Sequence, residues 1–301
     1  MVNPMQELLG PVALKTFIDE YWPFKPAHIS ASTQRVATTF PALSRVPLRE
    51  LIANYPAPIY AVFSKDTTGR QERLTTGSQA LAAFDAGASL CLSGLHTLSA
   101  EVSRMLESIA SELALPPSAT QCNCYVSAAG EGVPWHFDDR EVIVVQLQGR
   151  KQWTIAANSE VAFPTMNFVL ATGGPGDGDE LVHYAPRTIV GPQPDDERHL
   201  LLEPGSMLFM PRGTWHRTTA HEVSLSLTLG LFATTALSVL AAAVRAQGVR
   251  YAELRAPIPL ATPDQRRRSR LELLRLFSHW QKNMVGCPAE QLLNLVSAPE
   301  E

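Results

Sequence analysis

The stretch Pro134–Trp153, PWHFDDREVIVVQLQGRKQW, decides how this chain of 301 residues is expected to fold. It begins with His136 and Asp138, two residues apart, and continues into an apolar run at Glu141–Gln148. Side chains two apart on an extended strand leave the same face, so the imidazole and the carboxylate point together. This pair of ligands suits Fe(II), Mn(II) or Zn(II), although the spacing alone arises by chance in many proteins.

A second histidine follows about 80 residues later, at the end of EPGSMLFMPRGTWH, residues 203–216. The pattern predicts a strand at Met207–Met210 between two Pro/Gly turns, with His216 at the start of the next strand. Two histidines and one carboxylate on one face of a β-barrel make the facial triad of non-haem Fe(II) oxygenases, which leaves three coordination positions open. We therefore expect His136, Asp138 and His216 to bind a metal; the alternative is a structural hydrogen-bonded set.

Lys151 adds a third feature to this stretch. It is one of five lysines, and it begins a strand on which Lys151, Trp153 and Ile155 share a face. A lysine that faces an apolar interior costs free energy unless an anion pairs with it. A dicarboxylate cosubstrate would supply that anion and a charge-assisted hydrogen bond. The alternative is a surface lysine whose stem lies along apolar groups.

Short strands dominate the region from about residue 121 to residue 232, separated by turns and by polar loops at Gly173–Asp179 and Gly191–Arg198. Such spacing favours a sandwich or barrel over βαβ units. The flanks show helical patterns, including Leu98–Leu115 before the strands, and Thr234–Gln247, a helix from Thr262 to about Asn283, and one opening at Pro288 after them. The chain is thus expected to be mainly β with helical flanks, with one domain over 1–232 and a helical C-terminal segment over 233–301. The predicted strands are Asn123–Ser127, Glu141–Gln148, Lys151–Ala156, Met207–Met210 and Ser224–Phe232.

Composition excludes several classes of protein. The chain has 25 basic and 29 acidic side chains, a net charge of −4, and 45% hydrophobic residues, so it is neither disordered nor a basic nucleic-acid coat. The opening MVNPMQELLG lacks a signal-peptide pattern, and the apolar stretch Leu225–Val244 is interrupted by polar residues. Four cysteines without a CxxC pair favour reduced thiols. We expect a cytoplasmic protein with no membrane contact and no direct nucleic-acid binding.

Together these motifs resemble the JmjC-type 2-oxoglutarate oxygenases, and among them the cupin-4 branch that contains the ribosomal oxygenases. The branch shows N-x-Y, H-x-D-D, Q-L-x-G-x-K-x-W and L-x-P-G-D-x-L-Y-x-P-x-G-x-x-H in this order. The resemblance extends over about residues 14–232. The matching stretches here are Asn123–Tyr125, His136–Asp139, Gln146–Trp153 and Leu202–His216, preceded by Phe17–Pro26.

The resemblance implies a double-stranded β-helix, the jelly-roll barrel of JmjC and cupin proteins, with Fe(II) on His136, Asp138 and His216. It implies that Lys151 holds the far carboxylate of 2-oxoglutarate and that O₂ takes the last open position. It also implies that Asn123, Tyr125 and Thr228 line the cosubstrate pocket, with Ser226 on the same face as Thr228. The activity implied is a dioxygenase that hydroxylates an unactivated C–H bond of a protein or peptide side chain, as on ribosomal proteins. A homodimer through the C-terminal helices is also implied.

This sequence departs from the family pattern at a few places. Ser206 stands for the usual Asp, Phe209 for the usual Tyr, and the loop from Tyr125 to His136 is one residue shorter. Residues 234–301 suffice for the dimerisation segment of ribosomal oxygenases but not for their winged-helix module. Two other outcomes stay open: a JmjC oxygenase acting on a small molecule, modified RNA or N-methyl-lysine, and a cupin that binds metal without turnover. For an oxygenase, the polar loops at Gly173–Asp179 and Gly191–Arg198 are the elements expected to recognise the substrate.

Overall fold

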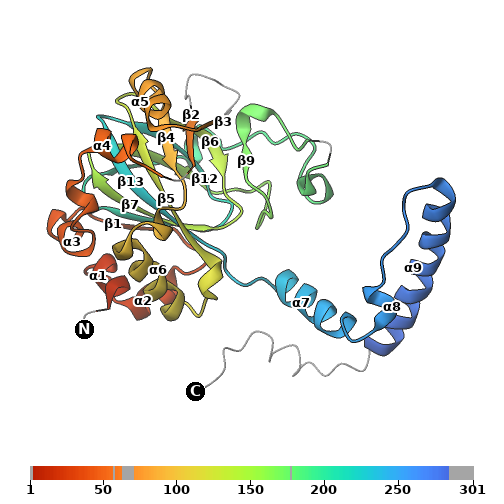
Figure 1. Cartoon of the computed structure of the whole chain (residues 1–301). Helices are drawn as coiled ribbons and strands as arrows, with labels where there is room; N and C mark the ends of the chain where they lie inside the picture. The colour runs from red at the N-terminus through yellow and green to blue at the C-terminus, as the bar shows by residue number, and fades with distance from the viewer. Residues whose placement is uncertain (1–2, 57, 63–70, 177, 285–301) are drawn as a thin grey trace. The chain divides into compact units, whose positions relative to one another are not determined.

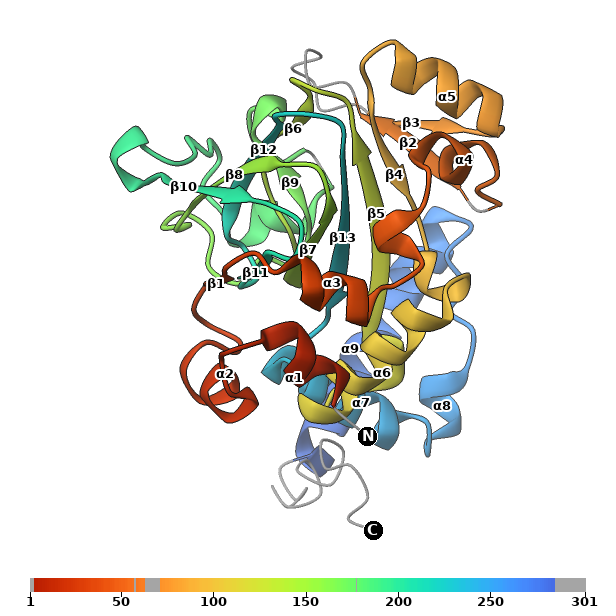
Figure 2. The ribbon, with the colours of Figure 1, turned by 90° about the vertical axis from the view of Figure 1, so that its left-hand side faces the viewer.

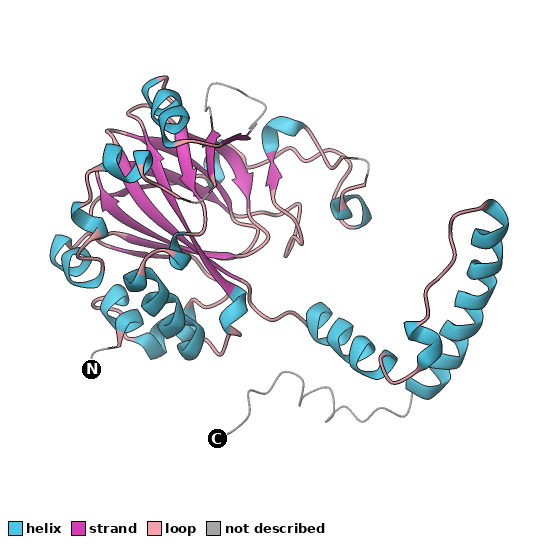
Figure 3. Cartoon of the chain, viewed as in Figure 1, coloured by secondary structure: helices cyan, strands magenta, loops and turns pink. Residues whose placement is uncertain are grey.

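The computed structural model describes residues 3–56, 58–62, 71–176 and 178–284. Two features named above lie outside the described residues: Cys287 and the helix predicted to open at Pro288. The chain divides into two compact units, Met1–Ala233 and Thr234–Glu301. The first unit contains every strand of the described residues, and the second contains helices alone (Figure 3).

The first unit is built on two antiparallel sheets (Figures 1 and 2). The larger has eight strands in the order β1-β11-β7-β13-β5-β4-β2-β3, and the smaller has five in the order β10-β8-β12-β6-β9. This is the predicted mainly β fold, a double-stranded β-helix of the cupin type, with helices at its flank. The strands are β1 (Ala27–Ile29), β2 (Ile59–Val62), β3 (Gln71–Leu74), β4 (Ser89–Leu92), β5 (Thr120–Ser127), β6 (Gly132–Phe137), β7 (Glu141–Gln148), β8 (Lys151–Ala156), β9 (Phe168–Val169), β10 (Arg198–Leu202), β11 (Met207–Met210), β12 (Trp215–Ala220) and β13 (Ser224–Leu231).

Helices cover the outer face of the larger sheet (Figure 2). The amphipathic pattern that predicts a helix at Leu98–Leu115 corresponds to α6, whose apolar side joins α1 and the sheet in one core. The helices of this unit are α1 (Pro4–Leu9), α2 (Leu14–Glu20), α3 (Thr33–Thr39), α4 (Leu48–Ala53), α5 (Gly77–Asp85) and α6 (Ala100–Glu112). Short 3₁₀ turns are η1 (Leu43–Arg45), η2 (Leu95–Thr97), η3 (Pro117–Ala119), η4 (Leu170–Thr172), η5 (Glu180–His183) and η6 (Pro194–Asp196).

The central strands are buried on both faces, which explains their nearly continuous apolar sequence. On β7, Ile143, Val145 and Leu147 pack against the helices. Val142 and Val144 point the other way, into a second core that includes Trp153 and Ile155 of the smaller sheet. The interior between the two sheets is therefore largely apolar, so any polar side chain there needs a specific partner.

The second unit comprises α7 (Ala236–Gly248), α8 (Ala252–Arg255) and α9 (Pro263–Met284). Thr262 caps α9: its hydroxyl accepts from the Gln265 backbone, and the Gln265 side chain accepts from the Thr262 backbone. This reciprocal cap is what the Thr262–Pro263–Asp264 signal predicts. None of the described helices is long and apolar enough to cross a membrane.

Candidate metal and cosubstrate site

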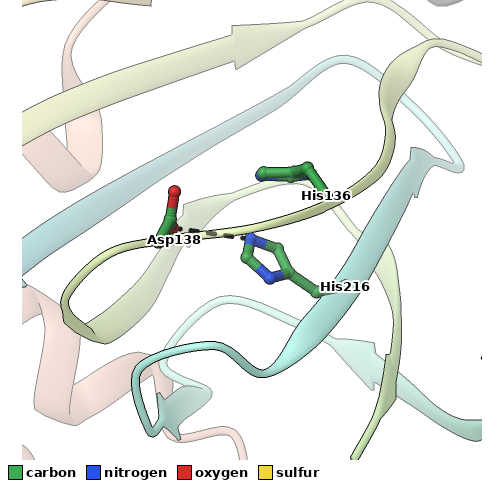
Figure 4. A group of neighbouring side chains, drawn as sticks. All are labelled: His136, Asp138 and His216. Atoms are coloured by element: carbon green, nitrogen blue, oxygen red, sulfur yellow. Dashed lines mark ion pairs between the residues drawn. The ribbon is translucent and has the colours of Figure 1, made fainter. Parts of the chain in front are cut away.

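The two histidines of the predicted triad face each other across neighbouring strands. His136 on β6 is the direct partner of His216 on β12, and a register irregularity follows between His216 and Thr218. Directly opposed residues of antiparallel strands project from the same face. Their ring centroids are 3.9 Å apart, and Asp138, just beyond the end of β6, completes the group (Figure 4).

The three side chains form a compact set of ligand atoms. One nitrogen or oxygen of each lies within 4.8 Å of the others, and Nε2 of His216 is 3.7 Å from Oδ2 of Asp138 (Figure 4). Within the described part of the chain, no other group of three or more His, Cys, Asp or Glu residues is arranged in this way. The structure thus brings together the three residues that the sequence predicts as ligands.

Both imidazoles are oriented by the backbone two residues earlier. Nδ1 of His136 donates to the Pro134 carbonyl at 2.8 Å, and Nδ1 of His216 donates to the Thr214 carbonyl at 2.9 Å. A carbonyl only accepts, so each Nδ1 carries the proton and each Nε2 is left with its lone pair. Burial, and then the neighbouring His136, lower the pKa of His216 to about 4, so its ring is neutral at physiological pH.

A backbone hydrogen bond joins the turn before β12 to Asp138. The backbone N–H of Gly213 donates to the carbonyl of Asp138 at 2.9 Å, which ties the carboxylate ligand to the strand of His216. Gly213 has a φ of +80°, and a Cβ there would lie 2.7 Å from Cδ of Pro164. The glycine of the P-x-G sequence is therefore required by both conformation and space.

Lys151 is buried to 1% exposure between the two sheets. Its Nζ donates to Oγ of Ser127 at 2.9 Å and lies 5.9 Å from the centre of the Tyr125 ring. No carboxylate among the described residues lies within ion-pair distance of this ammonium group. Burial lowers the pKa of Lys151 to about 8, as expected for a cation without a counter-charge.

An inner cavity of about 50 Å³ connects the triad with the lysine. On β8, Ile155 lies opposite His216 and Lys151 lies opposite Ala220, so the strand runs from the metal ligands to the ammonium group. Two polar atoms of this interior, Nε1 of Trp153 and Oγ of Ser226, are buried without a hydrogen-bond partner. The cavity is lined by Tyr125, Val133, His136, Asp138, Val142, Lys151, Trp153, His216, Thr218 and Thr228.

A larger outer cavity of about 240 Å³ adjoins the triad, and it also reaches His136, Asp138, Tyr125 and Thr228. Asn123 lines this outer cavity alone, and its Oδ1 accepts from the Gly94 backbone at 3.1 Å. Polar residues that the sequence did not single out also line it: Gln121, Arg140 and Asn167.

Two of the predicted cosubstrate residues thus line the inner cavity, whereas Asn123 lies toward the outer one. The partner of Lys151, Ser127, was missed, although strand alternation places it on the same face as Asn123 and Tyr125. Arg140 and Asn167 come from a turn and a loop, and no periodicity marks their side chains. Arg140 is held there by Asp139 at 2.7 Å and lies over the ring of Phe232.

Comparisons with known proteins agree with this geometry. Residues 96–239 match the family model described as JmjC domain. YxbC of Bacillus subtilis, described as uncharacterized, is 29% identical over 247 residues, which cover 80% of this chain and 74% of that protein. Ribosomal oxygenase 2 of Rattus norvegicus is 26% identical over 242 residues, 74% of this chain and 46% of that protein.

The fold has a solved counterpart. The structure of YcfD, a ribosomal oxygenase from Escherichia coli in complex with cobalt and succinic acid, superposes with a TM-score of 0.51 at 17% identity, covering 88% of this chain and 67% of that one. The chain spans less than half the length of the rat ribosomal oxygenase that it matches. This chain has the cupin-type fold, residues 96–239 match the JmjC domain, and the chain is similar to proteins named ribosomal oxygenases.

Proposed function

We propose that the chain is an Fe(II)- and 2-oxoglutarate-dependent dioxygenase that hydroxylates an unactivated C–H bond of a protein or peptide side chain. One observation carries the proposal: a His-Asp-His set and a buried ammonium group without a carboxylate partner line the same cavity. The first arrangement suits a divalent metal with open positions, and the second suits an anion that reaches the metal.

The donor set fits Fe(II). Two imidazole nitrogens and one carboxylate oxygen form the three-ligand face typical of non-haem iron, and the remaining positions stay free for other ligands. The carbonyls of Pro134 and Thr214 fix both rings with Nε2 toward Asp138. His136, Asp138 and His216 would therefore hold the metal without rearrangement of the backbone.

The interior also fits a dicarboxylate. Lys151 supplies a positive charge at the far end, and Nε1 of Trp153, which lines the cavity, is a buried donor whose missing hydrogen-bond partner a bound anion would provide. Thr228 and Tyr125 line the path between the two ends. The relative YcfD, with succinic acid and cobalt in its structure, supports this assignment.

When bound together, Fe(II), 2-oxoglutarate and O₂ supply oxidative decarboxylation and the transfer of one oxygen atom to a C–H bond. The residues of this chain bind and orient the reactants. His136, Asp138 and His216 would hold the metal, and Lys151 would hold the far carboxylate of the cosubstrate. Apolar walls, including Val142 and Trp153, keep water away from the reacting centre.

The outer cavity offers room for the substrate. Its volume of about 240 Å³ adjoins His136 and Asp138, which suits a single side chain presented by a protein or peptide. Relatives named ribosomal oxygenases favour a ribosomal protein. A small molecule, modified RNA or N-methyl-lysine remains the alternative substrate, and a non-catalytic cupin the alternative function. The homodimer and the cytoplasmic location stay predictions.

Turnover of the cosubstrate tests the proposal. Protein loaded anaerobically with Fe(II) and then given O₂ and 2-oxoglutarate should release succinate. The absence of succinate from correctly loaded wild-type protein would contradict the oxygenase and leave the non-catalytic cupin. The prime substrate is then sought by intact-mass comparison of cellular proteins from deletion and wild-type strains, where a difference of 16 Da marks hydroxylation.

Metal binding is tested separately. His136→Ala should abolish stoichiometric binding of Fe(II) or Co(II), whereas His221→Ala, which alters an exposed histidine between β12 and β13, should leave it unchanged. Stoichiometric metal retained by His136→Ala would show that the ligand assignment is wrong.

A further inference from the structure

The net charge of −4 conceals two regions of opposite charge. Residues 1–233 contain 16 basic and 23 acidic side chains, a formal charge of −7. Residues 234–301 contain nine basic and six acidic side chains, a formal charge of +3. All nine basic side chains, eight of them arginines, and three of the acidic ones lie in residues 234–284, whose formal charge is +6. The expectation that this chain does not bind nucleic acid rests on the net charge of the whole chain. That net charge describes neither the acidic nor the basic region.

The arginines occupy the exposed side of α9. Gln265, Ser269 and Leu276 are the least exposed described side chains of this helix, and Oγ of Ser269 donates to the Pro259 carbonyl. That side packs within the second unit and carries no arginine. Helical spacing spreads the exposed arginines over the remaining surface. They are Arg266, Arg267, Arg268, Arg270 and Arg275.

Within the described residues 234–284, most of this positive charge is not neutralised. Among residues 234–284 as described, one ion pair is present, between Arg267 and Asp264 at 3.3 Å, and both of its side chains are exposed. Arg266 donates to the Leu260 and Ala261 carbonyls, which orders the side chain without cancelling its charge. Three further exposed arginines precede α9: Arg245, Arg250 and Arg255.

The distribution of apolar residues separates RNA from a membrane as the partner. A helix that lies in a membrane surface needs a continuous apolar face with the cations on the opposite side. On α9, Leu271 lies between Arg267 and Arg275 at successive helical turns, and Leu274 follows Arg270 in the same way. The guanidinium groups instead match a phosphate backbone, because the fork of arginine binds phosphate oxygens in pairs.

We propose that the arginine surface of residues 245–275 binds the phosphate backbone of RNA without sequence preference. This surface would hold the acidic first unit near an RNA-containing partner, in addition to whatever its outer cavity recognises. The proposal does not depend on the chemistry at the metal site.

The test uses the full chain and a fluorescently labelled 20-nucleotide oligouridylate. Anisotropy should show binding at 50 mM salt that weakens steeply toward 200 mM. Changing Arg267, Arg268 and Arg275 together to Gln should weaken binding at least tenfold. The same variant should lower the slope of log K against log salt by about 2, since each phosphate contact contributes about 0.7 for a single strand.

A matched control removes the same charge elsewhere. Changing Arg73, Arg104 and Arg187 to Gln, all exposed in the first unit, should leave the affinity within about twofold. A second variant, with Lys at positions 267, 268 and 275, keeps the charge and should retain the salt slope even if the Gln variant folds poorly.

Four results would overturn the proposal. The first is no anisotropy change at 50 mM salt, and the second is equal loss of binding in the two Gln variants. The third is binding of phosphatidylserine vesicles, but not of RNA, that depends on these arginines, which would assign the surface to a membrane. Light scattering across the salt range shows whether the arginines instead join two copies of the chain, which would also contradict RNA binding.

Discussion

At the scale of single residues, Lys151 carries a positive charge into the apolar interior of the first unit. Its ammonium group is buried, contacts the hydroxyl of Ser127, and lacks a carboxylate among the described residues. A protein that keeps such a charge accepts a cost in stability, and the cost is offset when an anion binds. The residue thus links the stability of the free protein to the affinity for its cosubstrate.

Lys151→Met should separate these two effects. We expect the dissociation constant for succinate or 2-oxoglutarate on Co(II)-loaded protein to rise at least 30-fold, with Co(II) affinity changed less than about threefold. The free variant should be more stable by about 1–3 kcal/mol, because an unpaired buried cation is removed. Calorimetric titration and urea unfolding measure these values. Lys25→Met, at an exposed lysine, is the control, and equal effects in both variants would contradict the role of Lys151.

The pKa of Lys151, lowered by burial to about 8 from an ordinary value of 10.5, gives cosubstrate binding a pH dependence. Below pH 8 the ammonium group is charged, and the dissociation constant for the cosubstrate should not depend on this group. Above pH 8 a proton must be taken up, so the dissociation constant should rise up to tenfold per pH unit. Between pH 8 and 10.5 the unfolded chain binds more protons, so the free protein gains stability from this group as pH rises.

Titrations in two buffers of different ionisation heat measure the proton uptake at pH 8.5. Wild type should take up about three quarters of a proton for each dicarboxylate bound, the fraction of Lys151 that is neutral at this pH, and Lys151→Met none. A dissociation constant that stays flat from pH 7 to 9.5 in wild type would show that another group holds the anion.

At the scale of elements, the turn between β7 and β8 positions Lys151. Gly149 in this turn has a φ of +66°, and a Cβ there would lie 2.2 Å from the Val223 carbonyl oxygen. Gly149→Ala should therefore destabilise the protein by at least about 3 kcal/mol, through both conformation and steric overlap. Gly130→Ala is the control: its φ is +81° but no atom lies within 4 Å, so a cost of about 1 kcal/mol is expected. Urea unfolding compares the two, and equal costs would contradict the steric argument.

The strands marked by apolar runs could be predicted from the sequence. Apolar runs predict β7, β8, β11 and β13 nearly to their ends, and β5 from its fourth residue. Pro134, His136 and the two threonines of β12 stand where apolar residues would mark a buried strand, so β6 is not predicted over its length and β12 is predicted only as a strand that begins at His216. Polar side chains that face the metal site interrupt the period of two on which strand prediction depends. The motif spacing predicts the grouping of the triad, whereas the residues lining the outer cavity are set by tertiary packing alone.

At the scale of the whole molecule, the site and the arginine surface belong to different units. Every residue of the inner cavity lies in Met1–Ala233, and the arginine surface lies in Thr234–Glu301. A fragment of residues 1–233 should bind Co(II) and succinate with affinities within about threefold of the full chain, as measured by calorimetry. Loss of both would show that the site needs the helical unit, as an obligate dimer through those helices would require.

β8 also fixes the length of acid that the site accepts. Hydrogen bonds to β10 on one side and β12 on the other hold about 13 Å of strand between Ile155, opposite His216, and Lys151. Neither end can shift to meet a shorter or longer chain. Oxaloacetate, one carbon shorter, would chelate the metal and leave its second carboxylate short of the ammonium group, and 2-oxoadipate would be compressed. With the cosubstrate bound as proposed, each should bind at least tenfold more weakly than 2-oxoglutarate in competition titrations, and the rigidity of one strand would make the site selective for the five-carbon acid.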